Sequence, residues 1–381
     1  MNYVGTARPI HDAKGKATGY TKYAGDLSLP NMAYLCMLHS KIPHGYVKAV
    51  HAEKALALPG VYGVYHCLNT SDRKYNRYRS SFNQAYLANE ERAFNQYVRF
   101  VGDKIGVVAA CDQETAERAA RLVEVEYEEL PFSIGFDDTL AGKNCLEGET
   151  PVRDEYTLEV GKKQESTEGL IEVCSTMELP RLHHATMETH ACIADYDPYS
   201  DMLTVYCPNQ AVHGIRTVLA DFLEMPESHV RVVKATMGGS FGAKQEWFLE
   251  PVTALVAKKL CRPVKLVYSR GEAMTDTIVR GAMRMSARGY YTPDGEMKEI
   301  YCDVTLDAGA YIGNAGDYVR ALAGKPTRCY RIPYMHYHGQ VISSNSPVSG
   351  AFRSWSAAEE ALMMERQLDA AAEKLGMDRL A

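Results

Sequence analysis

The run GGSFGAKQ at residues 238–245 surrounds one phenylalanine with small residues, and it constrains the fold more than any other feature. Glycine permits positive φ and carries no Cβ, so this backbone can approach another group closely and direct its N–H groups at it. The spacing matches neither the phosphate-binding G-x-x-x-x-G-K-[ST] loop nor the dinucleotide-binding G-x-G-x-x-G run. The residues alone leave two interpretations open. The run is either a binding loop or a tight turn between an apolar strand at 230–233 and a helix that begins at residue 246.

Charge and hydropathy exclude several classes of protein. The chain has 381 residues, enough for two or three domains, and 42 basic against 48 acidic residues give a net charge of −6. This balance provides no basic surface for nucleic acid or anionic lipid. No apolar run approaches the roughly 18 residues that span a bilayer, and the first residues lack a secretory signal pattern. We therefore expect a cytoplasmic protein that binds a small molecule.

Cysteine and histidine spacing does not predict a metal site. The ten cysteines include no C-x-x-C pair, which disfavours a zinc ribbon or an iron-sulfur cluster and indicates reduced thiols. His183, His184 and His190 lie close together in the sequence, but they lack H-E-x-x-H spacing and a completing carboxylate. We expect these histidines on a polar turn before a strand.

The pattern of elements predicts two domains. We place the first at residues 1–140 and the second at 170–381. The segment 141–169 is polar, charged and contains glycine, so we interpret it as a linker. The first domain is predicted to contain strands at 61–66, 105–110 and 123–130 and a helix at 113–120 capped by Asp112.

The second domain is predicted to repeat β-α-β order and to end in a long helix. Gly376 is a suitable C-cap for that helix. Alternating apolar residues predict strands, and longer amphipathic runs predict helices. The predicted strands are 191–196, 202–207, 230–233, 264–268, 285–291 and 297–306, and the predicted helices are 215–224, 246–260 and 357–375.

Five short motifs spread over nearly the whole chain form a joint pattern. They are GTARPIHDAKGKATG at 5–19, HATMETH at 184–190, PNQ at 208–210, GGSFGAKQ at 238–245 and GAFRSW at 350–355. Together they resemble motifs of the molybdopterin-binding subunits of the xanthine dehydrogenase and aldehyde oxidase family, although His11 stands where Arg is usual. The resemblance implies an α+β fold in which an N-terminal a/b hammerhead domain precedes the first part of the molybdopterin-binding α/β domain.

The resemblance also implies which residues contact a molybdenum-molybdopterin cofactor. In the family, the Gln of the third motif, the Phe of the glycine run and the Arg after Ala-Phe lie at this cofactor, which places Gln210, Phe241 and Arg353 there. Gly239 and Gly242 would let the loop backbone approach it. The amide and the guanidinium are suitable donors. Ordinary structural roles remain the alternatives: a capped strand end, a core aromatic and a helix-end ion pair.

Three further positions correspond to the family's substrate pocket. Gln245 stands where purine-oxidising members carry a carboxylate, and an amide supplies hydrogen bonds without negative charge. Trp355 offers a stacking face for a flat heterocycle, or alternatively anchors the start of a helix in the core. Arg320 would bind substrate and stabilise negative charge in the transition state, although its spacing to the motif CYRIP at 329–333 is one residue longer than usual.

The implied reaction is hydroxylation of an aromatic N-heterocycle, either a purine such as xanthine or hypoxanthine or nicotinate, with oxygen derived from water. Two alternatives are an aldehyde oxidoreductase subunit and a non-catalytic scaffold subunit. The family's copper-containing carbon monoxide dehydrogenases carry a Cys where this chain has Gly350, which disfavours that chemistry. Glu188, Glu246 and Glu272 are not expected to serve as the general base, because nothing in the sequence around them predicts a perturbed pKa. We expect surface or structural roles for them.

The resemblance further implies a multi-subunit enzyme. The family's general-base Glu lies beyond the last motif found here, so the sequence is either a fragment or one half of a split molybdopterin subunit, as in nicotinate dehydrogenase. We expect the split arrangement, in which a second molybdopterin subunit supplies this Glu. Since the chain has no cluster or flavin motif, separate 2Fe-2S and FAD subunits are implied. The cytosine dinucleotide form of the cofactor is expected, with no side chain of this protein bound directly to the metal.

Overall fold

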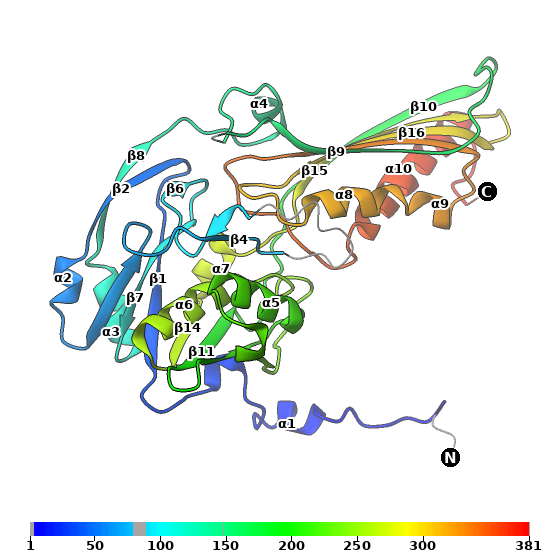
Figure 1. Ribbon diagram of the computed structural model, residues 1–381. Helices are drawn as coiled ribbons and strands as arrows, with labels where there is room; N and C mark the ends of the chain where they lie inside the picture. The colour runs from blue at the N-terminus through cyan, green and yellow to red at the C-terminus, as the bar shows by residue number, and fades with distance from the viewer. Residues whose placement is uncertain (1–3, 79–88, 147, 381) are drawn as a thin grey trace.

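A seven-stranded mixed sheet forms the larger core of the molecule. The computed structural model describes residues 4–78, 89–146 and 148–380 (Figure 1). The strand order is β13-β12-β11-β14-β1-β7-β3. The strands are β1 (Ala33–His39), β3 (Val61–His66), β7 (Lys104–Ala110), β11 (Ala191–Asp197), β12 (Met202–Cys207), β13 (Val230–Lys234) and β14 (Val264–Val267).

This sheet contains strands from both predicted domains. β1 pairs in parallel with β14, where Ala33 lies opposite Val264, and antiparallel with β7. β7 is buried along its whole length, as expected of a strand rich in β-branched residues and alanine that is paired on both sides. Three helices pack on the sheet: α3 (Gln113–Ala120), α5 (Val212–Phe222) and α6 (Glu250–Leu260). The Asp112 side chain caps α3 by accepting a hydrogen bond from the Thr115 N–H at 2.7 Å.

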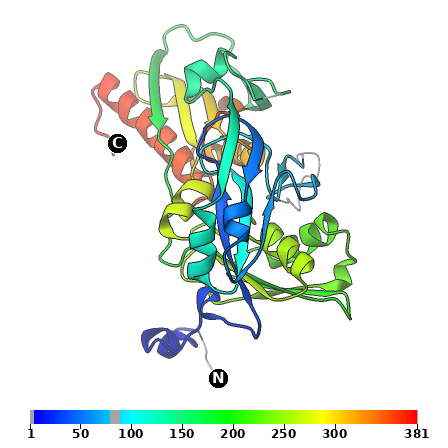
Figure 2. The same cartoon turned by 90° about the vertical axis from the view of Figure 1, so that its left-hand side faces the viewer.

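A five-stranded sheet forms the second core and lies apart from the first (Figures 1 and 2). The helices α8 (Ala315–Ala323) and α10 (Ala357–Leu375) pack on it, and their apolar residues share one buried cluster with the strands. α10 ends at Gly376, whose φ of +67° is left-handed. The strand order is β10-β15-β16-β17-β9, from β9 (Val152–Gly161), β10 (Ile171–Leu179), β15 (Ala282–Tyr291), β16 (Met297–Asp307) and β17 (Tyr334–Ile342).

The linker prediction for residues 141–169 is wrong, because this segment contains β9. All ten residues of β9 lie on the edge of the five-stranded sheet, antiparallel to β17. From Glu155 onward its sequence alternates polar and apolar side chains, so one face is partly buried and the other is exposed. The charges give the segment the composition of a linker, whereas the pairing partner lies more than 150 residues later in the chain.

Smaller elements complete the fold. A buried ion network joins β5 (Glu91–Arg92) to β7. Glu91 accepts hydrogen bonds from Arg77 Nε at 2.6 Å and from Lys104 Nζ at 2.5 Å. No helix among the described residues is long and apolar enough to cross a bilayer. The remaining strands are β2 (Gly45–His51), β4 (Lys74–Tyr75), β5 (Glu91–Arg92), β6 (Tyr97–Val98) and β8 (Glu124–Glu129), and the remaining helices are α1 (Ala13–Ala17), α2 (Glu53–Leu56), α4 (Phe136–Leu140), α7 (Arg270–Asp276) and α9 (Pro326–Cys329), with 3-10 turns at Ala24–Asp26 and Glu227–His229.

The α+β prediction is confirmed, and most predicted elements lie within a few residues of their observed bounds. The helix at 357–375 and the strand at 202–207 match those of the structure. The helix predicted from residue 246 instead begins at Glu250, because residues 241–248 form turns. Those turns belong to the glycine run and its surroundings.

Candidate functional site

The glycine loop, residues 235–249, and the loop that contains Gln210 lie at the same edge of the seven-stranded sheet. They follow β13 and β12, which are parallel neighbours, so both leave from the strands' carboxyl ends. The Gln210 N–H donates to the Lys244 carbonyl at 2.8 Å, and the Ser240 hydroxyl donates to Gln210 Oε1 at 2.8 Å. Gln210 is therefore held against the glycine loop.

A third loop, residues 350–356, packs directly onto the glycine loop. Gly242 has a φ of +107°, and a Cβ there would lie 2.3 Å from the Ala351 carbonyl oxygen. Only glycine fits this close contact between two main chains. Gly239 and Phe241 also have positive φ, and the Phe241 side chain is half-exposed. The structure thus brings Gln210, Phe241 and Gly242 beside the loop that contains Arg353.

The 350–356 loop holds three consecutive residues in the left-handed region. Ser354, Trp355 and Ser356 have φ values of +78°, +45° and +64°. Each such non-glycine residue costs roughly 1–2 kcal/mol. The Lys325 ammonium offsets part of this strain by donating to the Trp355 carbonyl and to the Ser356 hydroxyl. Strain of this kind is concentrated at functional sites.

Phe352 anchors this loop, and Arg353 extends from it. The Phe352 ring lies 4.3 Å from the His184 ring, between centroids, and the Arg280 guanidinium lies 4.2 Å from its centroid. Arg280 also donates to the Arg353 carbonyl at 3.0 Å. The Arg353 side chain itself is exposed. The backbone of Arg353 is therefore fixed while its guanidinium faces solvent.

Two histidines of the motif at 184–190 hold the loops by their main chains. His184 Nε2 bonds the Ala351 carbonyl at 2.8 Å, and His190 Nε2 bonds the Ala243 carbonyl at 3.0 Å. Because a carbonyl only accepts, each Nε2 carries the proton. Burial lowers the pKa of both imidazoles to about 4, so both are neutral near pH 7. These contacts agree with the polar turn predicted there.

Glu188 of the same motif ties the two ends of the glycine run together. One carboxylate oxygen accepts from the Gly238 N–H at 2.7 Å and from Lys244 Nζ at 2.6 Å. The Lys244 side chain is buried, which lowers its pKa, while hydrogen bonding to Glu188 opposes that change. The structural role expected for Glu188 is confirmed. The sequence singled out the motif, but only the contacts reveal that it holds both loops.

The environment of Glu246 differs from the one expected from the sequence. Its carboxyl is fully buried behind the 350–356 loop and accepts a hydrogen bond from the Asn314 amide at 2.8 Å. Burial raises its pKa from 4.5 to about 8, and the charge of Arg77 offsets only part of that rise. The expectation of an unperturbed pKa is wrong for Glu246. Glu272 caps the start of α7 through the Ser269 N–H, a structural role as expected.

The three residues expected to bind substrate do not share one environment. Gln245 closes the glycine run, where its N–H donates to the Gly242 carbonyl at 3.1 Å. Trp355 packs against Tyr318 of α8, with 5.2 Å between ring centroids, and is partly buried. Arg320 lies two residues after Tyr318, about 200° around the helix, so its side chain points to a different side. There it forms a bidentate ion pair with Asp154 of β9 at 2.7 and 3.0 Å.

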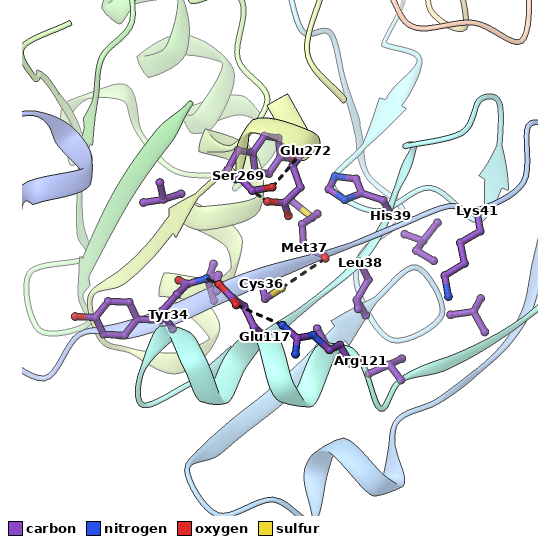
Figure 3. Close-up of a pocket in the computed structure, with 18 of the residues that line it drawn as sticks. Tyr34, Cys36, Met37, Leu38, His39, Lys41, Glu117, Arg121, Ser269 and Glu272 are labelled. Carbon is purple, nitrogen blue, oxygen red and sulfur yellow. Dashed lines mark hydrogen bonds and ion pairs between the residues drawn. The ribbon is translucent and has the colours of Figure 1, made fainter. Parts of the chain in front are cut away.

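A separate cavity of about 1000 Å³ lies between β1, α3 and the start of α7 (Figure 3). Cys36 and Leu38 of β1 line it, together with Glu117 of α3 and Arg121, which directly follows that helix. Burial raises the pKa of Cys36 to about 12, so this thiol is protonated near pH 7. None of the residues lining the cavity belongs to the three loops, and the cavity is therefore not part of the site they form.

Comparison with known proteins identifies the class. The chain belongs to the family of molybdopterin cofactor-binding domains found in molybdenum-dependent oxidoreductases, since the model of this family matches residues 149–381. The model of the a/b hammerhead domain of aldehyde oxidase and xanthine dehydrogenase matches residues 18–131. The resemblance drawn from the five motifs is confirmed, as is the order of the two domains.

Particular relatives lie within this family. The chain is 30% identical over 371 residues to the nicotinate dehydrogenase large molybdopterin subunit of Eubacterium barkeri, covering 96% of this chain and 85% of that protein. It is also 30% identical over 382 residues to the xanthine dehydrogenase molybdenum-binding subunit of Escherichia coli O157:H7, covering 96% of this chain and 50% of that protein. The chain thus spans about half the length of the xanthine dehydrogenase subunit.

A solved structure supports the same assignment. The aldehyde oxidoreductase from Desulfovibrio gigas has a TM-score of 0.91 and 25% identity, and the match covers 99% of this chain and 42% of that one. The two chains therefore share their fold over nearly all of the present chain.

Proposed function

We propose that this chain is the molybdopterin-binding subunit of a molybdenum hydroxylase that oxidises an aromatic N-heterocycle with oxygen derived from water. The observation that carries the proposal is the meeting of three loops at one edge of the seven-stranded sheet. They bring Gln210, Phe241 and Gly242 beside the strained loop of Arg353 and Trp355. In a family defined by molybdopterin binding, this edge is the candidate cofactor site.

The residues at this edge fit a molybdopterin cofactor. Gln210 Nε2 makes no hydrogen bond within the described part of the chain, because only its Oε1 is engaged, by Ser240. The exposed Arg353 guanidinium offers further donors, and the glycine loop presents backbone without a side chain at Gly239, while Gly242 lets the loop pack against Ala351. When bound, the molybdenum centre would supply the oxygen transfer and electron acceptance that no side chain here provides.

The substrate proposal depends on Gln245 and Trp355. An amide at position 245 can bond a ring nitrogen or an N–H without demanding a positive or protonated partner. The accessible part of the Trp355 ring can stack on a planar heterocycle. We keep Arg320 as a substrate ligand only in a conformation that leaves Asp154. Nicotinate, xanthine and hypoxanthine are thus the compounds to test, and an aldehyde is the alternative.

Copper-dependent chemistry is disfavoured by the space around Gly350. A Cβ there would lie 2.6 Å from Ile278 Cδ1 and 2.7 Å from Glu246 Oε1. A cysteine in the position used by copper-binding relatives would therefore clash with both side chains. A glycine at this point suits a hydroxylase that uses molybdenum alone.

The remaining parts of the proposal concern partners. We include a second molybdopterin subunit that carries the general-base Glu, together with 2Fe-2S and FAD subunits that carry electrons away. We also include the cytosine dinucleotide form of the cofactor and a cytoplasmic location, with which ten free cysteines are consistent. Relatives whose names include the word subunit support this multi-subunit arrangement.

Metal and substrate analysis of the native complex tests the proposal. We expect molybdenum and pterin in stoichiometric amounts, and turnover of at least one N-heterocycle faster than that of a simple aldehyde. Gln245→Glu should shift preference toward the purines, while Gln245→Asn serves as the neutral control. An intact complex without molybdenum would reject the enzyme assignment and favour a scaffold. Faster turnover of the aldehyde would reject the heterocycle.

A further inference from the structure

Residues 4–22 form an arm that buries none of its apolar side chains. Every residue from 4 to 20 except Gly15 is exposed, and the short helix α1 within the arm contains no buried residue. The arm projects away from both sheets (Figures 1 and 2). Ile10 and Tyr20 are 74% and 86% exposed. Apolar side chains held in solvent along one segment are typical of a surface that another molecule covers.

The arm also has a charge opposite to that of the whole chain. It carries four basic residues and one acidic residue, a net charge of +3, whereas the complete chain has a net charge of −6. Within the arm, Lys16 pairs with Asp12 at 2.6 Å, and Lys14 and Lys22 are exposed. A basic segment with interspersed apolar side chains matches an acidic surface that has apolar hollows.

The base of the arm lies beside the glycine loop. Tyr23, the residue after the arm, forms a parallel bridge with Thr236, two residues before the glycine run. A Cβ on Gly238 would lie 3.4 Å from the Tyr23 ring. The neighbouring surface is also apolar, because Phe241 is half-exposed and Met187 is almost fully exposed. A polypeptide that covers the glycine loop would therefore also contact the base of the arm.

We propose that residues 4–22 are a docking arm for the second molybdopterin-binding polypeptide, which presents to it an acidic surface with apolar hollows for Ile10 and Tyr20. This inference rests on the proposed function, because its occupant is the polypeptide that completes the site. It goes beyond the proposed function by assigning the contact with that polypeptide to residues 4–22. It also explains why the motif at 5–19 occurs in a segment that contributes nothing to either core.

Purification of the native complex through a C-terminal affinity tag on this chain tests the docking arm. Two double variants change it, Ile10→Asp with Tyr20→Asp, and Lys14→Glu with Lys22→Glu. Tyr199→Asp and Lys41→Glu are matched controls, because Tyr199 is 99% exposed on a turn and Lys41 is exposed, both outside the arm. The recovered polypeptide must be identified by mass spectrometry as a molybdopterin-binding chain.

We expect the arm variants to retain at least ten-fold less of that polypeptide, while both controls retain the wild-type amount. The unfolding midpoint of the tagged chain should not change, since the arm has no buried residue. Wild-type retention should fall as salt concentration rises. Three results would each overturn the docking arm. The arm variants could retain the polypeptide fully, only a second copy of this chain could be recovered, or no second molybdopterin-binding polypeptide could be present. The molybdenum content of the wild-type complex is measured alongside. If molybdenum is present, these outcomes reject only the docking arm, whereas an intact complex without molybdenum rejects the proposed function itself.

Discussion

Glu246→Gln should make the protein more stable at neutral and alkaline pH, because it removes a buried group that resists ionisation. The Glu246 carboxyl has a pKa of about 8 in the folded chain, against an ordinary value of 4.5. Its contribution to folding is fully present below pH 4.5, where it is protonated in both states. That contribution is lost as pH rises toward 8, because the unfolded chain ionises first. Glutamine has nearly the same shape and cannot ionise.

The size of the effect follows from the interval between the two pKa values. Each pH unit between 4.5 and 8 costs the wild type about 1.4 kcal/mol of folding free energy. At pH 7 the penalty is about 3 kcal/mol, and above pH 8 it levels off at about 5 kcal/mol. The amide oxygen of Gln can keep the hydrogen bond from Asn314, so we expect most of this difference to appear as added stability.

Urea unfolding at pH 5, 7 and 9 measures the effect. The difference between variant and wild type should increase from pH 5 to pH 9, and it should exceed 2 kcal/mol at pH 9 by the same relation, about 1.4 kcal/mol per pH unit. Glu165→Gln, on an exposed bend, is the control and should leave the pH dependence unchanged. Parallel stability curves for Glu246→Gln and wild type would show that Glu246 is ionised in the fold, and the reasoning about its burial would then be incorrect.

Three further changes and one control test the loops and the fold. Glu188→Gln leaves the Lys244 ammonium buried without its ion pair, so it should destabilise by about 2–4 kcal/mol and lower the molybdenum bound per folded chain. Glu91→Gln is the control, because it disrupts the buried ion pairs of Glu91 with Arg77 and Lys104 and should leave the molybdenum content per folded chain unchanged. An equal loss of molybdenum from both variants would refute a specific role for Glu188. Gly242→Ala should destabilise by about 2–5 kcal/mol and abolish cofactor retention, and a variant with normal molybdenum content would contradict the close packing of the two loops. Asp112→Ala should cost about 1 kcal/mol in urea unfolding through loss of the α3 cap, with no change in molybdenum content.

Local signals explain which elements the sequence predicted well. α3 has its N-cap at Asp112, and α10 has its C-cap at Gly376, so each helix carries a local signal for one of its ends. β9 carries no such signal, because its charged face resembles a linker and its partner β17 is distant in the chain. Strand pairing over such distances depends on the tertiary structure, which local patterns do not encode.

In the candidate site, too, the sequence predicts features with local signals and misses those that depend on distant contacts. The glycine run predicted a close backbone contact, and the structure provides it at Gly242. The environment of Glu246 was not predictable, because its burial results from Asn314 and the 350–356 loop, which meet it only in the folded chain. The ion pair of Arg320 with Asp154 likewise depends on β9, whose local composition is that of a linker.

The parallel pairing of β1 with β14 delays completion of the seven-stranded sheet during synthesis. These strands are about 230 residues apart in the chain. At roughly 5–20 residues per second, a ribosome needs on the order of 10–50 s to deliver β14 after β1 has emerged. During that interval β1 can pair with β7, but its other edge stays open to neighbouring chains. We therefore expect the yield of folded chain in cells to depend on chaperone protection of the nascent polypeptide more than on the stability of the finished sheet.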